Sequence, residues 1–386
     1  MFDALLSQDR YGQVRTYLGA VFGDNLHAKR IESLSGATLG VIQATSLAVC
    51  TIGQALAQAR NLTAKHATKQ VDRLLSNSGI NVWAMFADWV PEVVGDASHI
   101  RVIIDWTAFD SDDQATVMVS RATSHGRSTP LVWLSVWKDE LKDNQNDYED
   151  AVLQRLSEVL PAGVAVTVLA DRGFGDRKLL GFLDELGFDY VIRMRNNITV
   201  QAADGETRKS ADWVGKHGRA RKLSNARITN AEKHVPAVVC VHAKGMQEPW
   251  CLVTSTADAK AAEIKNLYAR RWTTEPTFRD TKDLRFGMGL NAVHVSEPQR
   301  RDRLLLLNAF AITLLTLLGE ASESLGMDKG LKTNTARKRV HSLFRQGCLL
   351  YDAIPNMSDR RLQPLMEKFA ELINQKRMFR ETFSTL

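Results

Sequence analysis

Residues 99 to about 196 alternate short β-branched runs with amphipathic stretches, and this order restricts the fold more than any other feature of the chain. Strands are predicted at 101–107, 115–121, 130–137, 164–170 and 189–194, and helices at 147–160 and 177–187. Three strands followed by helix, strand, helix, strand predict an α/β sheet.

Two acidic residues follow buried-strand patterns in this segment. Asp105 ends the run R-V-I-I-D, and Asp171 ends V-A-V-T-V-L-A-D. An aspartate at the end of a buried strand is costly unless it is paired or metal-bound. Asp171 has an alternative interpretation as the N-cap of the next helix. If the first and fourth strands are neighbours, the two carboxylates lie side by side.

A later segment, Y-A-R-R-W-T-T-E-P-T-F-R-D-T-K, carries four functional side-chain types at fixed spacing. They are Tyr268, Arg271, Glu275 and Lys282. On a continuous α-helix these positions fall within an arc of about 60°. A face that combines an acid with two cations suits a metal ion and the phosphates around it. The alternative is a solvated face with an i,i+4 ion pair between Arg271 and Glu275.

Asp105, Asp171 and Glu275 together predict a three-carboxylate site for two Mg²⁺ (or Mn²⁺) ions, because hard cations prefer oxygen ligands. Pro276 complicates this prediction, since it follows the glutamate directly. Proline disfavours the α conformation of the preceding residue and clashes with the carbonyl four residues back, here that of Trp272. The helix therefore either kinks at Trp272–Glu275 or starts anew with Pro276 at its first position.

Further short motifs accompany these residues along most of the chain. They are T-K-Q-V-D-R-L-L-S-N, V-I-I-D-W-T, S-H-G-R-S, L-A-D-R-G-F, E-P-W-C-L-V-T-S and N-T-A-R-K-R-V. With them, the chain resembles the DDE transposases of the bacterial insertion-sequence family with the Y-R-E-K signature. Within that family it is most similar to the transposases of composite tetracycline- and kanamycin-resistance transposons, especially the former.

The resemblance implies an α/β catalytic core of ribonuclease-H-like (retroviral-integrase-like) fold, and the predicted order of strands and helices agrees with it. In that fold the first and fourth strands are parallel neighbours, which would place Asp105 and Asp171 side by side. We expect a helical DNA-binding domain at residues 1–98 and the catalytic domain at 99–300. A β-rich insertion is expected at about 197–256, where short β-like runs alternate with Gly, Asn and basic residues. Residues 301–386 are expected to form a helical C-terminal region.

The resemblance also implies roles for individual residues. Asp105, Asp171 and Glu275 would be the catalytic metal ligands, and Tyr268, Arg271 and Lys282 would contact phosphates. Trp250 would stack on a base flipped out of the transposon end; its alternative is a buried tryptophan at a strand start. His125, in S-H-G-R-S, is either close to the site or an ordinary turn residue.

Basic residues cluster at three places, which favours a nucleic-acid partner over a solvated surface. Lys65, Lys69 and Arg73 recur every fourth residue and so share one helix face. They lie within 52–77, a segment that predicts two helices broken near residues 60–62, as in a helix-turn-helix. The other clusters lie at 208–233 and 337–339.

The predicted activity is that of a cut-and-paste DNA transposase. Its partners would be double-stranded DNA (the terminal inverted repeats and the target), with the protein a homodimer in the DNA complex. The alternatives are a structure-specific nuclease on the same fold and a non-enzymatic DNA-binding protein derived from a transposase. The presence of all three acids argues against the second alternative.

Composition sets weaker limits on function. The 386 residues carry a net charge of +6 and a pI near 9.1, with ordinary hydrophobic content. Four scattered cysteines without a C-x-x-C pair fit reduced thiols in the cytoplasm, where the protein would associate with the nucleoid. The most apolar stretch, Leu304 to Leu318, is shorter than a membrane span, and we expect a buried helix and no membrane partner.

Overall fold

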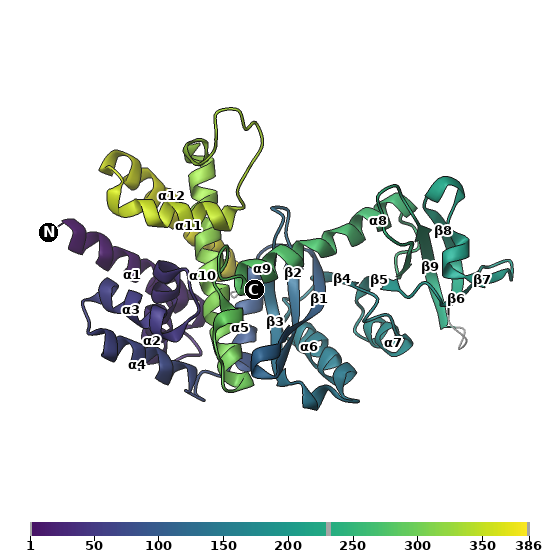
Figure 1. Ribbon diagram of the computed structural model, residues 1–386, viewed down its shortest axis with the longest axis horizontal. Helices are drawn as coiled ribbons and strands as arrows, with labels where there is room; N and C mark the ends of the chain where they lie inside the picture. Colours follow the sequence, from purple (N-terminus) through teal and green to yellow (C-terminus); the bar gives the residue numbers. More distant parts are fainter. Residues whose placement is uncertain (1, 229–232, 384–386) are drawn as a thin grey trace.

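The computed structural model describes residues 2–228 and 233–383. The molecule is elongated, with the N-terminal and C-terminal helices at one end and a large sheet running from the middle to the other end (Figure 1). A long helix, α10 (Pro298–Ser324), stands between these two parts. The candidate catalytic acids therefore lie between a helical end and a β-rich end.

A single ten-stranded sheet contains every strand in the described residues, in the order β3-β2-β1-β4-β5-β10-β9-β8-β6-β7. The strands are β1 (His99–Phe109), β2 (Gln114–Ala122), β3 (Ser128–Trp137), β4 (Ala165–Ala170), β5 (Asp189–Met194), β6 (Thr199–Gln201), β7 (Thr207–Lys209), β8 (Arg221–Ile228), β9 (Lys233–Val241) and β10 (Trp250–Thr254). The first five occupy the positions predicted from the β-branched runs. The prediction falls short mainly at the ends of β1.

The parallel pairing that the sequence predicts is confirmed. β1 runs parallel to β4, and β4 runs parallel to β5, whereas β2 and β3 are antiparallel to their neighbours. This is the strand order of a ribonuclease-H-like sheet, and the chain is a mixed α/β protein. The central strands are buried on both faces, which explains their continuous apolar character.

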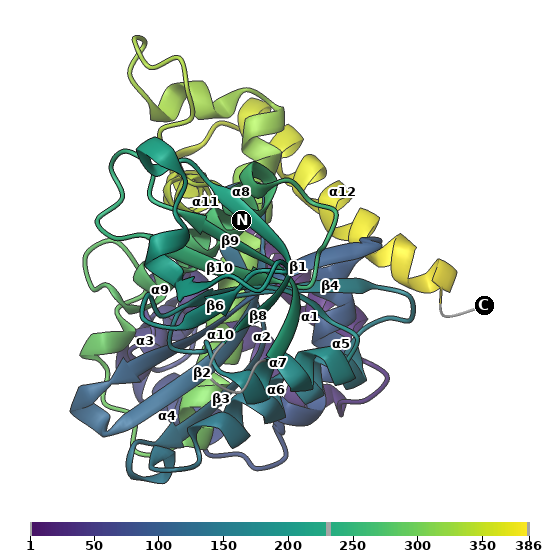
Figure 2. The same cartoon turned by 90° about the vertical axis from the view of Figure 1, so that its right-hand side faces the viewer.

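Strands β6 to β10 extend the same sheet beyond β5, because β10 pairs antiparallel to β5. Figure 2 shows this end of the molecule facing the viewer. The predicted β-like runs Ala237–His242 and Trp250–Thr254 correspond to β9 and β10. Cys240 and Cys251 are buried opposite each other on these strands, and all four cysteines are free thiols.

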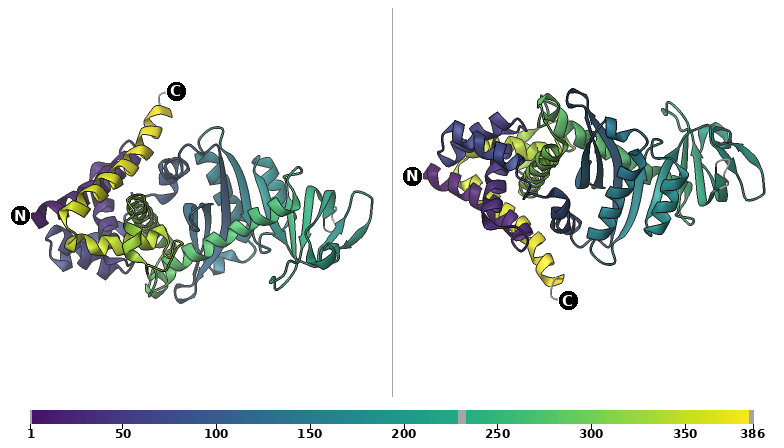
Figure 3. Two further views of the ribbon diagram at one scale, coloured as in Figure 1. Left: turned by 90° about the horizontal axis from the view of Figure 1, so that it is seen from above. Right: turned by 90° about the horizontal axis from the view of Figure 1, so that it is seen from below.

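Helices cover both faces of the central strands. On one side lie α6 (Gln145–Val159) and α7 (Arg177–Glu185). On the other side α8 (Ala261–Ala269), the 3₁₀ turn η5 (Arg270–Thr273) and α9 (Thr274–Lys282) run in line across the sheet, as seen from above and below in Figure 3. Shorter 3₁₀ turns link other elements: η1 (Asp110–Asp112), η2 (Asp139–Leu141), η3 (Ser210–Trp213), η4 (Lys216–Gly218), η6 (Leu290–Ala292), η7 (Met327–Leu331) and η8 (Ile354–Asn356).

Five helices form the N-terminal part: α1 (Phe2–Phe22), α2 (Ala28–Ala44), α3 (Val49–Arg60), α4 (Ala64–Leu75) and α5 (Val82–Val94). The predicted pair of helices within 52–77 corresponds to α3 and α4. Asn61 ends α3 in the left-handed conformation, and the Thr63 hydroxyl caps α4 by accepting from the His66 amide. Gly53 lets the two helices cross closely, since a Cβ there would meet the Thr68 backbone.

The most apolar segment forms the interior of α10, a helix that is longer than the predicted stretch at both ends. By length and composition this helix could cross a bilayer, as could α2 and α3 taken together although they bend by 100°. In α10, however, 83% of the most apolar 18-residue window is buried inside the protein. It packs against β3, α2, α11 (Leu343–Ala353) and α12 (Asp359–Phe383), so it serves as a core helix.

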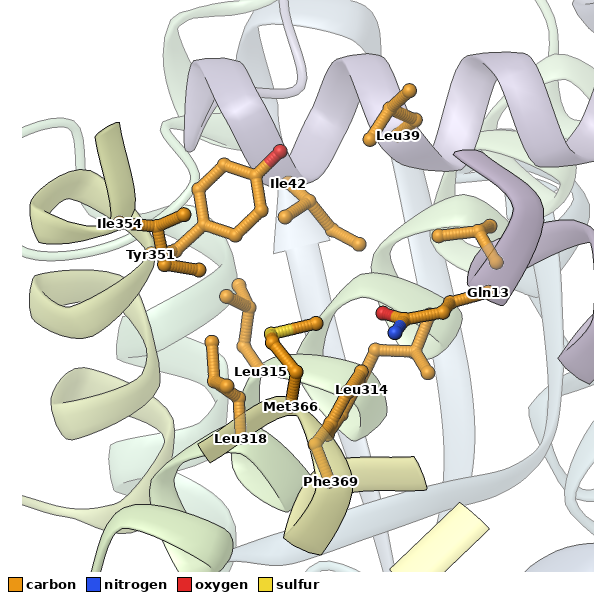
Figure 4. Close-up of a pocket in the computed structure, with 11 residues that line it drawn as sticks. Gln13, Leu39, Ile42, Leu314, Leu315, Leu318, Tyr351, Ile354, Met366 and Phe369 are labelled. Atoms are coloured by element: carbon orange, nitrogen blue, oxygen red, sulfur yellow. The ribbon is translucent and has the colours of Figure 1, made fainter. Parts of the chain in front are cut away.

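One hydrophobic cluster runs from the N-terminal helices through α10 to the central strands. Its packing leaves a small apolar cavity of about 40 Å³ between α1, α2, α10, α11 and α12, shown in Figure 4. Leu314 and Leu318 of α10 and Phe369 of α12 line this cavity. The apolar core thus crosses the positions near 98 and 300 at which the sequence suggests domain boundaries.

A buried carboxyl group ties α10 to the sheet. The Asp302 side chain accepts a hydrogen bond from the Ser135 amide at 3.0 Å, and its carbonyl accepts one from the Trp133 indole at 3.3 Å. Burial raises the pKa of Asp302 to about 7, against the opposing effect of the Ser135 hydrogen bonds and of Arg303. The folded protein therefore holds a proton here that the unfolded chain releases at a lower pH.

This difference predicts a pH-dependent contribution to stability. Between about pH 4 and pH 7 only the folded state keeps Asp302 protonated, so its contribution to the free energy of unfolding falls as pH rises. Asp302→Asn removes this titration. In urea unfolding, the free energy of unfolding of the variant should therefore rise relative to that of the wild type from pH 5 to pH 7. Parallel stability curves for the two proteins would contradict the assignment.

Candidate active site

The parallel pairing of β1 and β4 places Asp105 and Asp171 at equivalent positions on neighbouring strands. Ile103 pairs with Leu169, and each aspartate lies two residues further along its strand direction. β4 ends at Ala170, and the Asp171 carboxylate accepts from the Gly173 amide at 2.7 Å. β1 continues to Phe109 because it stays paired with β2, so Asp105 lies within the strand and not at its end.

Asp105 carries the electrostatic signature of a crowded acidic site. Burial raises its pKa to about 6, the Arg271 guanidinium opposes this rise, and the nearby charges of Asp171 and Glu275 add to it. The two aspartates and the glutamate are therefore close enough to influence one another. Near pH 6 a proton therefore competes with a metal cation for the Asp105 carboxylate.

The signature segment is not one continuous α-helix. α8 ends at Ala269, residues 270–273 tighten into the 3₁₀ turn η5, and α9 begins at Thr274. Pro276 is the third residue of α9, where its missing N–H has no intrahelical partner to lose. Neither alternative is observed as predicted, because the flanking residues Ala269, Arg270, Thr273 and Thr274 keep right-handed helical dihedrals and Pro276 is the third residue of α9 and not the first. The assumption of a single 60° arc was therefore wrong.

Contacts with the start of β3 hold α9 in place. The Ser128 amide donates to the Thr277 hydroxyl at 2.8 Å, and Arg127 pairs with Asp280 at 2.5 Å. His125, from the same hairpin, lines a polar cavity of about 160 Å³ on this side of α9, together with Arg121 and Glu320. It lies beside the helix that carries Glu275.

Arg271 lies between two of the predicted metal ligands. Its guanidinium nitrogens are 3.6 Å from the Asp105 carboxylate and 3.3 Å from that of Glu275. The Arg271 side chain is mostly buried, and its Nε has no hydrogen-bond partner, whereas the Glu275 side chain is 60% exposed. Arg271 is the cation that balances these acids in the protein alone.

The donor chemistry of Asp105, Asp171 and Glu275 fits a hard divalent cation. Within residues 2–228 and 233–383, however, no three His, Cys, Asp or Glu side chains lie close enough together to enclose a metal ion. The guanidinium of Arg271 takes the place between Asp105 and Glu275. Closing a three-carboxylate site therefore requires the exposed Glu275 side chain to turn inward and Arg271 to move toward another anion, such as a phosphate.

Lys282 faces β1 next to Asp105. Its ammonium donates to the Thr107 hydroxyl at 2.9 Å and to the Ala108 carbonyl at 2.8 Å, and it lies 4.8 Å from the centre of the Phe109 ring. Burial lowers the pKa of Lys282. Thr107 shares a strand face with Asp105, so Arg271 and Lys282 place two cations along one edge of the acidic site.

Three aromatic side chains form a cluster beside this site. The Trp250 ring lies 5.0 Å from that of Tyr268 and 5.2 Å from that of Trp272, both in edge-to-face geometry. Trp250 is 6% exposed and Tyr268 2%, whereas Trp272 is 47% exposed. In the DNA-free protein the accessible indole is therefore Trp272, and burial raises the pKa of the Tyr268 phenol.

The remaining predicted residues lie elsewhere. Lys65, Lys69 and Arg73 are exposed on α4, which packs on α2, α3 and α10 and not on the catalytic strands. Sequence reasoning missed Trp272 as the exposed aromatic residue, although it lies inside the signature. It also missed the charged run R-R-D-R at the start of α10. The available signal was a charged run placed directly before a long apolar stretch of sequence.

The different burial of the two tryptophans predicts different effects on stability. Trp250→Ala should lower the free energy of unfolding by about 3–5 kcal/mol, because it empties a packed position. Trp272→Ala should cost about 1 kcal/mol, since it loses one aromatic contact at the surface. Urea unfolding measures both, and equal losses would mean that Trp272 is as buried as Trp250.

Part of the chain is similar to a known protein family. Residues 139–314 match the family model described as the Transposase DDE domain. The match contains Asp171 and the whole signature segment, while Asp105 precedes it. No curated protein matches the chain. Residues 139–314 are thus similar to the transposase DDE domain, a family whose enzymes normally use divalent metal ions and catalyse DNA cleavage and strand transfer.

Proposed function

We propose that this protein is a cut-and-paste DNA transposase of the insertion-sequence type with the Y-R-E-K signature. The observation that carries the proposal is that Arg271 pairs with both Asp105 and Glu275, next to Asp171 at the equivalent position of the neighbouring strand, in a chain whose residues 139–314 match the Transposase DDE domain. Its substrates are the terminal inverted repeats of its own element and a target duplex. It acts on them as a homodimer, one active site for each end.

The three acids have one shared role. Asp105, Asp171 and Glu275 would hold two Mg²⁺ or Mn²⁺ ions, which supply Lewis-acid activation of the attacking oxygen and neutralise the leaving oxygen. Asp105 is held by its strand, and its carboxylate accepts from the Trp106 amide at 3.0 Å. Glu275 is the adjustable member, because its side chain is exposed and bonded only to Arg271 among the contacts described.

The basic side chains of the signature bind the phosphates. When a scissile phosphate enters, Arg271 exchanges its weak 3.6 Å contact with Asp105 for a charge-assisted hydrogen bond to a phosphate oxygen. Lys282 offers its ammonium at the next position along β1. The Tyr268 hydroxyl, buried beside Arg271, orients that guanidinium and can donate to a phosphate only after Arg271 has moved.

The reaction proceeds by successive phosphoryl transfers at one site. Water first nicks one strand at each transposon end and frees a 3′-hydroxyl. That hydroxyl attacks the opposite strand and closes the end as a hairpin, which a second water reopens before the 3′-hydroxyl attacks target DNA. Each hairpin needs a sharply bent strand, which an extruded base relieves.

The aromatic stack provides a surface for that base. Trp272 is exposed and rests on Trp250, so an extruded base meets Trp272 first. Stacking on an indole is worth about 1–3 kcal/mol per base. Trp250 packs against Trp272 and would contact the extruded base directly only if Trp272 moves aside.

Alanine replacement of the acids tests the proposal. Asp105→Ala, Asp171→Ala and Glu275→Ala should each reduce Mg²⁺- or Mn²⁺-dependent cleavage to background, because a lost ligand removes stabilisation that only the reaction requires. DNA affinity should stay near that of the wild type. Asp147→Ala, an exposed acid on α6, is the matched control and should cleave normally. Normal turnover by any of the three variants would exclude that acid from the site.

Salt dependence tests the basic face of α4. If Lys65, Lys69 and Arg73 contact phosphates, each alanine variant should reduce the slope of log K against log salt by about 0.9. Gel-shift titrations at several salt concentrations measure this slope. An unchanged slope in all three variants would show that these residues of α4 do not bind the DNA.

A structure-specific nuclease on the same fold would use the same acids. Incubation with a pre-cut end and a target plasmid distinguishes the two activities, since only a transposase joins the 3′-hydroxyl to the target. Cleavage without joined products would favour the nuclease.

A further inference from the structure

The first turns of α10 contain four consecutive charged residues, Arg300, Arg301, Asp302 and Arg303. Their side chains divide between two different partners. Arg300 and Arg303 contact the N-terminal helices, whereas Arg301 and Asp302 contact the catalytic sheet. We refer to these four residues as the α10 clasp.

The contacts to the N-terminal helices all meet the carboxyl end of α4. Arg300 pairs with Asp72 at 2.7 Å and donates to the Ser76 hydroxyl. Arg303 donates to the Leu75 and Ile80 carbonyls, each at 2.9 Å. These carbonyls belong to the last turn of α4 and the loop behind it, so the clasp also satisfies backbone acceptors at a helix end.

The contacts to the sheet meet the strands that carry and flank Asp105. Arg301 is fully buried, donates to the Gln114 side chain at 2.7 Å and pairs with Asp112 in the β1–β2 turn. Asp302 accepts from the Ser135 amide of β3. Arg301 also lies 3.8 Å from the centre of the Phe109 ring, the ring that Lys282 approaches at 4.8 Å.

We propose that the α10 clasp is a positioning device that fixes α4 relative to the acidic site, so that DNA held by α4 reaches Asp105 in register. The inference rests on the proposed function and adds four positioning residues to it. Neither set of polar contacts alone would do this, because their combination on one rigid helix links α4 by directed polar contacts to β1, β2 and β3.

The orientation of α4 supports this role. Asp72 and Ser76 lie on the same side of α4 as Lys65, Lys69 and Arg73, at the end of that side. Arg300 therefore fixes the edge of the proposed DNA-contacting face itself. Apolar packing could hold α4 on α10 with similar energy, whereas paired charges and directed hydrogen bonds specify one arrangement.

The test uses the full chain and two DNA duplexes. The long duplex is one selected by the wild type from a random-sequence library. The short duplex is the same DNA trimmed, at the side away from the nick, until wild type and Lys65→Ala bind it equally, so that α4 no longer engages it. Affinity, first-order cleavage rate at saturation and nick position are measured on both with Mg²⁺ and with Mn²⁺.

Asp72→Ala and Arg300→Ala should each bind the long duplex with wild-type affinity, cleave it about tenfold more slowly and spread the nick over neighbouring positions. The double variant should be no worse than either single one, because all three break the same contact. On the short duplex every variant should match the wild type. Arg300→Lys, which can still reach Asp72, should keep most of the rate.

Arg15→Ala is the matched control, since it breaks an exposed ion pair with Glu32 between α1 and α2. It should behave as the wild type on both duplexes. Equal rate losses on long and short DNA would reduce the clasp to a stability element and overturn the proposal. Weaker binding by Arg300→Ala but not by Asp72→Ala would make Arg300 a DNA contact instead. If the wild type cleaves neither duplex, the proposed function fails, and not the clasp.

Discussion

The pairing of β1 with β4 is the contact on which the candidate active site depends. Ile103 opposite Leu169 sets the register, and Asp105 and Asp171 follow from it. A slip of one residue would turn one of the two carboxylates to the opposite face of the sheet. The buried β-branched residues on both strands make such a slip costly, so the apolar core specifies the position of the polar site.

Three acids that converge in a partly buried place repel one another, and Arg271 relieves this repulsion. Burial first, and then the charges of the neighbouring acids, makes Asp105 harder to ionise than an ordinary aspartate, whereas the same acids raise the pKa of Arg271. The Arg271 guanidinium thus supplies positive charge where the proposed divalent metal ions would supply it during catalysis. In the proposed function, DNA entry would be an exchange of partners, in which a phosphate binds Arg271 and releases the acids.

The sequence predicted the five core strands because they depend on local apolar patterns, and the meeting of Asp105 with Asp171 followed from the fold that the family resemblance implies. It did not predict the break between Ala269 and Thr274, since a spacing argument assumes one helical period and Pro276 changes it. It also left open whether Trp250 is buried, and it missed Trp272 as the accessible tryptophan. The burial of Trp250 depends on Tyr268 and Trp272, which meet it only in the folded chain. The α10 clasp was missed for the same reason, since its partners lie far away in sequence.

The hydrophobic cluster that runs through α10 has a consequence for how such a protein can change over time. Because the helices near α4, the central strands and α11 share one core, an exchange of the N-terminal segment with that of a distant relative would expose apolar surface and leave Arg301 without its surroundings. If α4 binds the DNA as proposed, new DNA specificity would therefore arise by substitutions on its exposed side, one residue at a time, and not by exchange of the whole N-terminal segment.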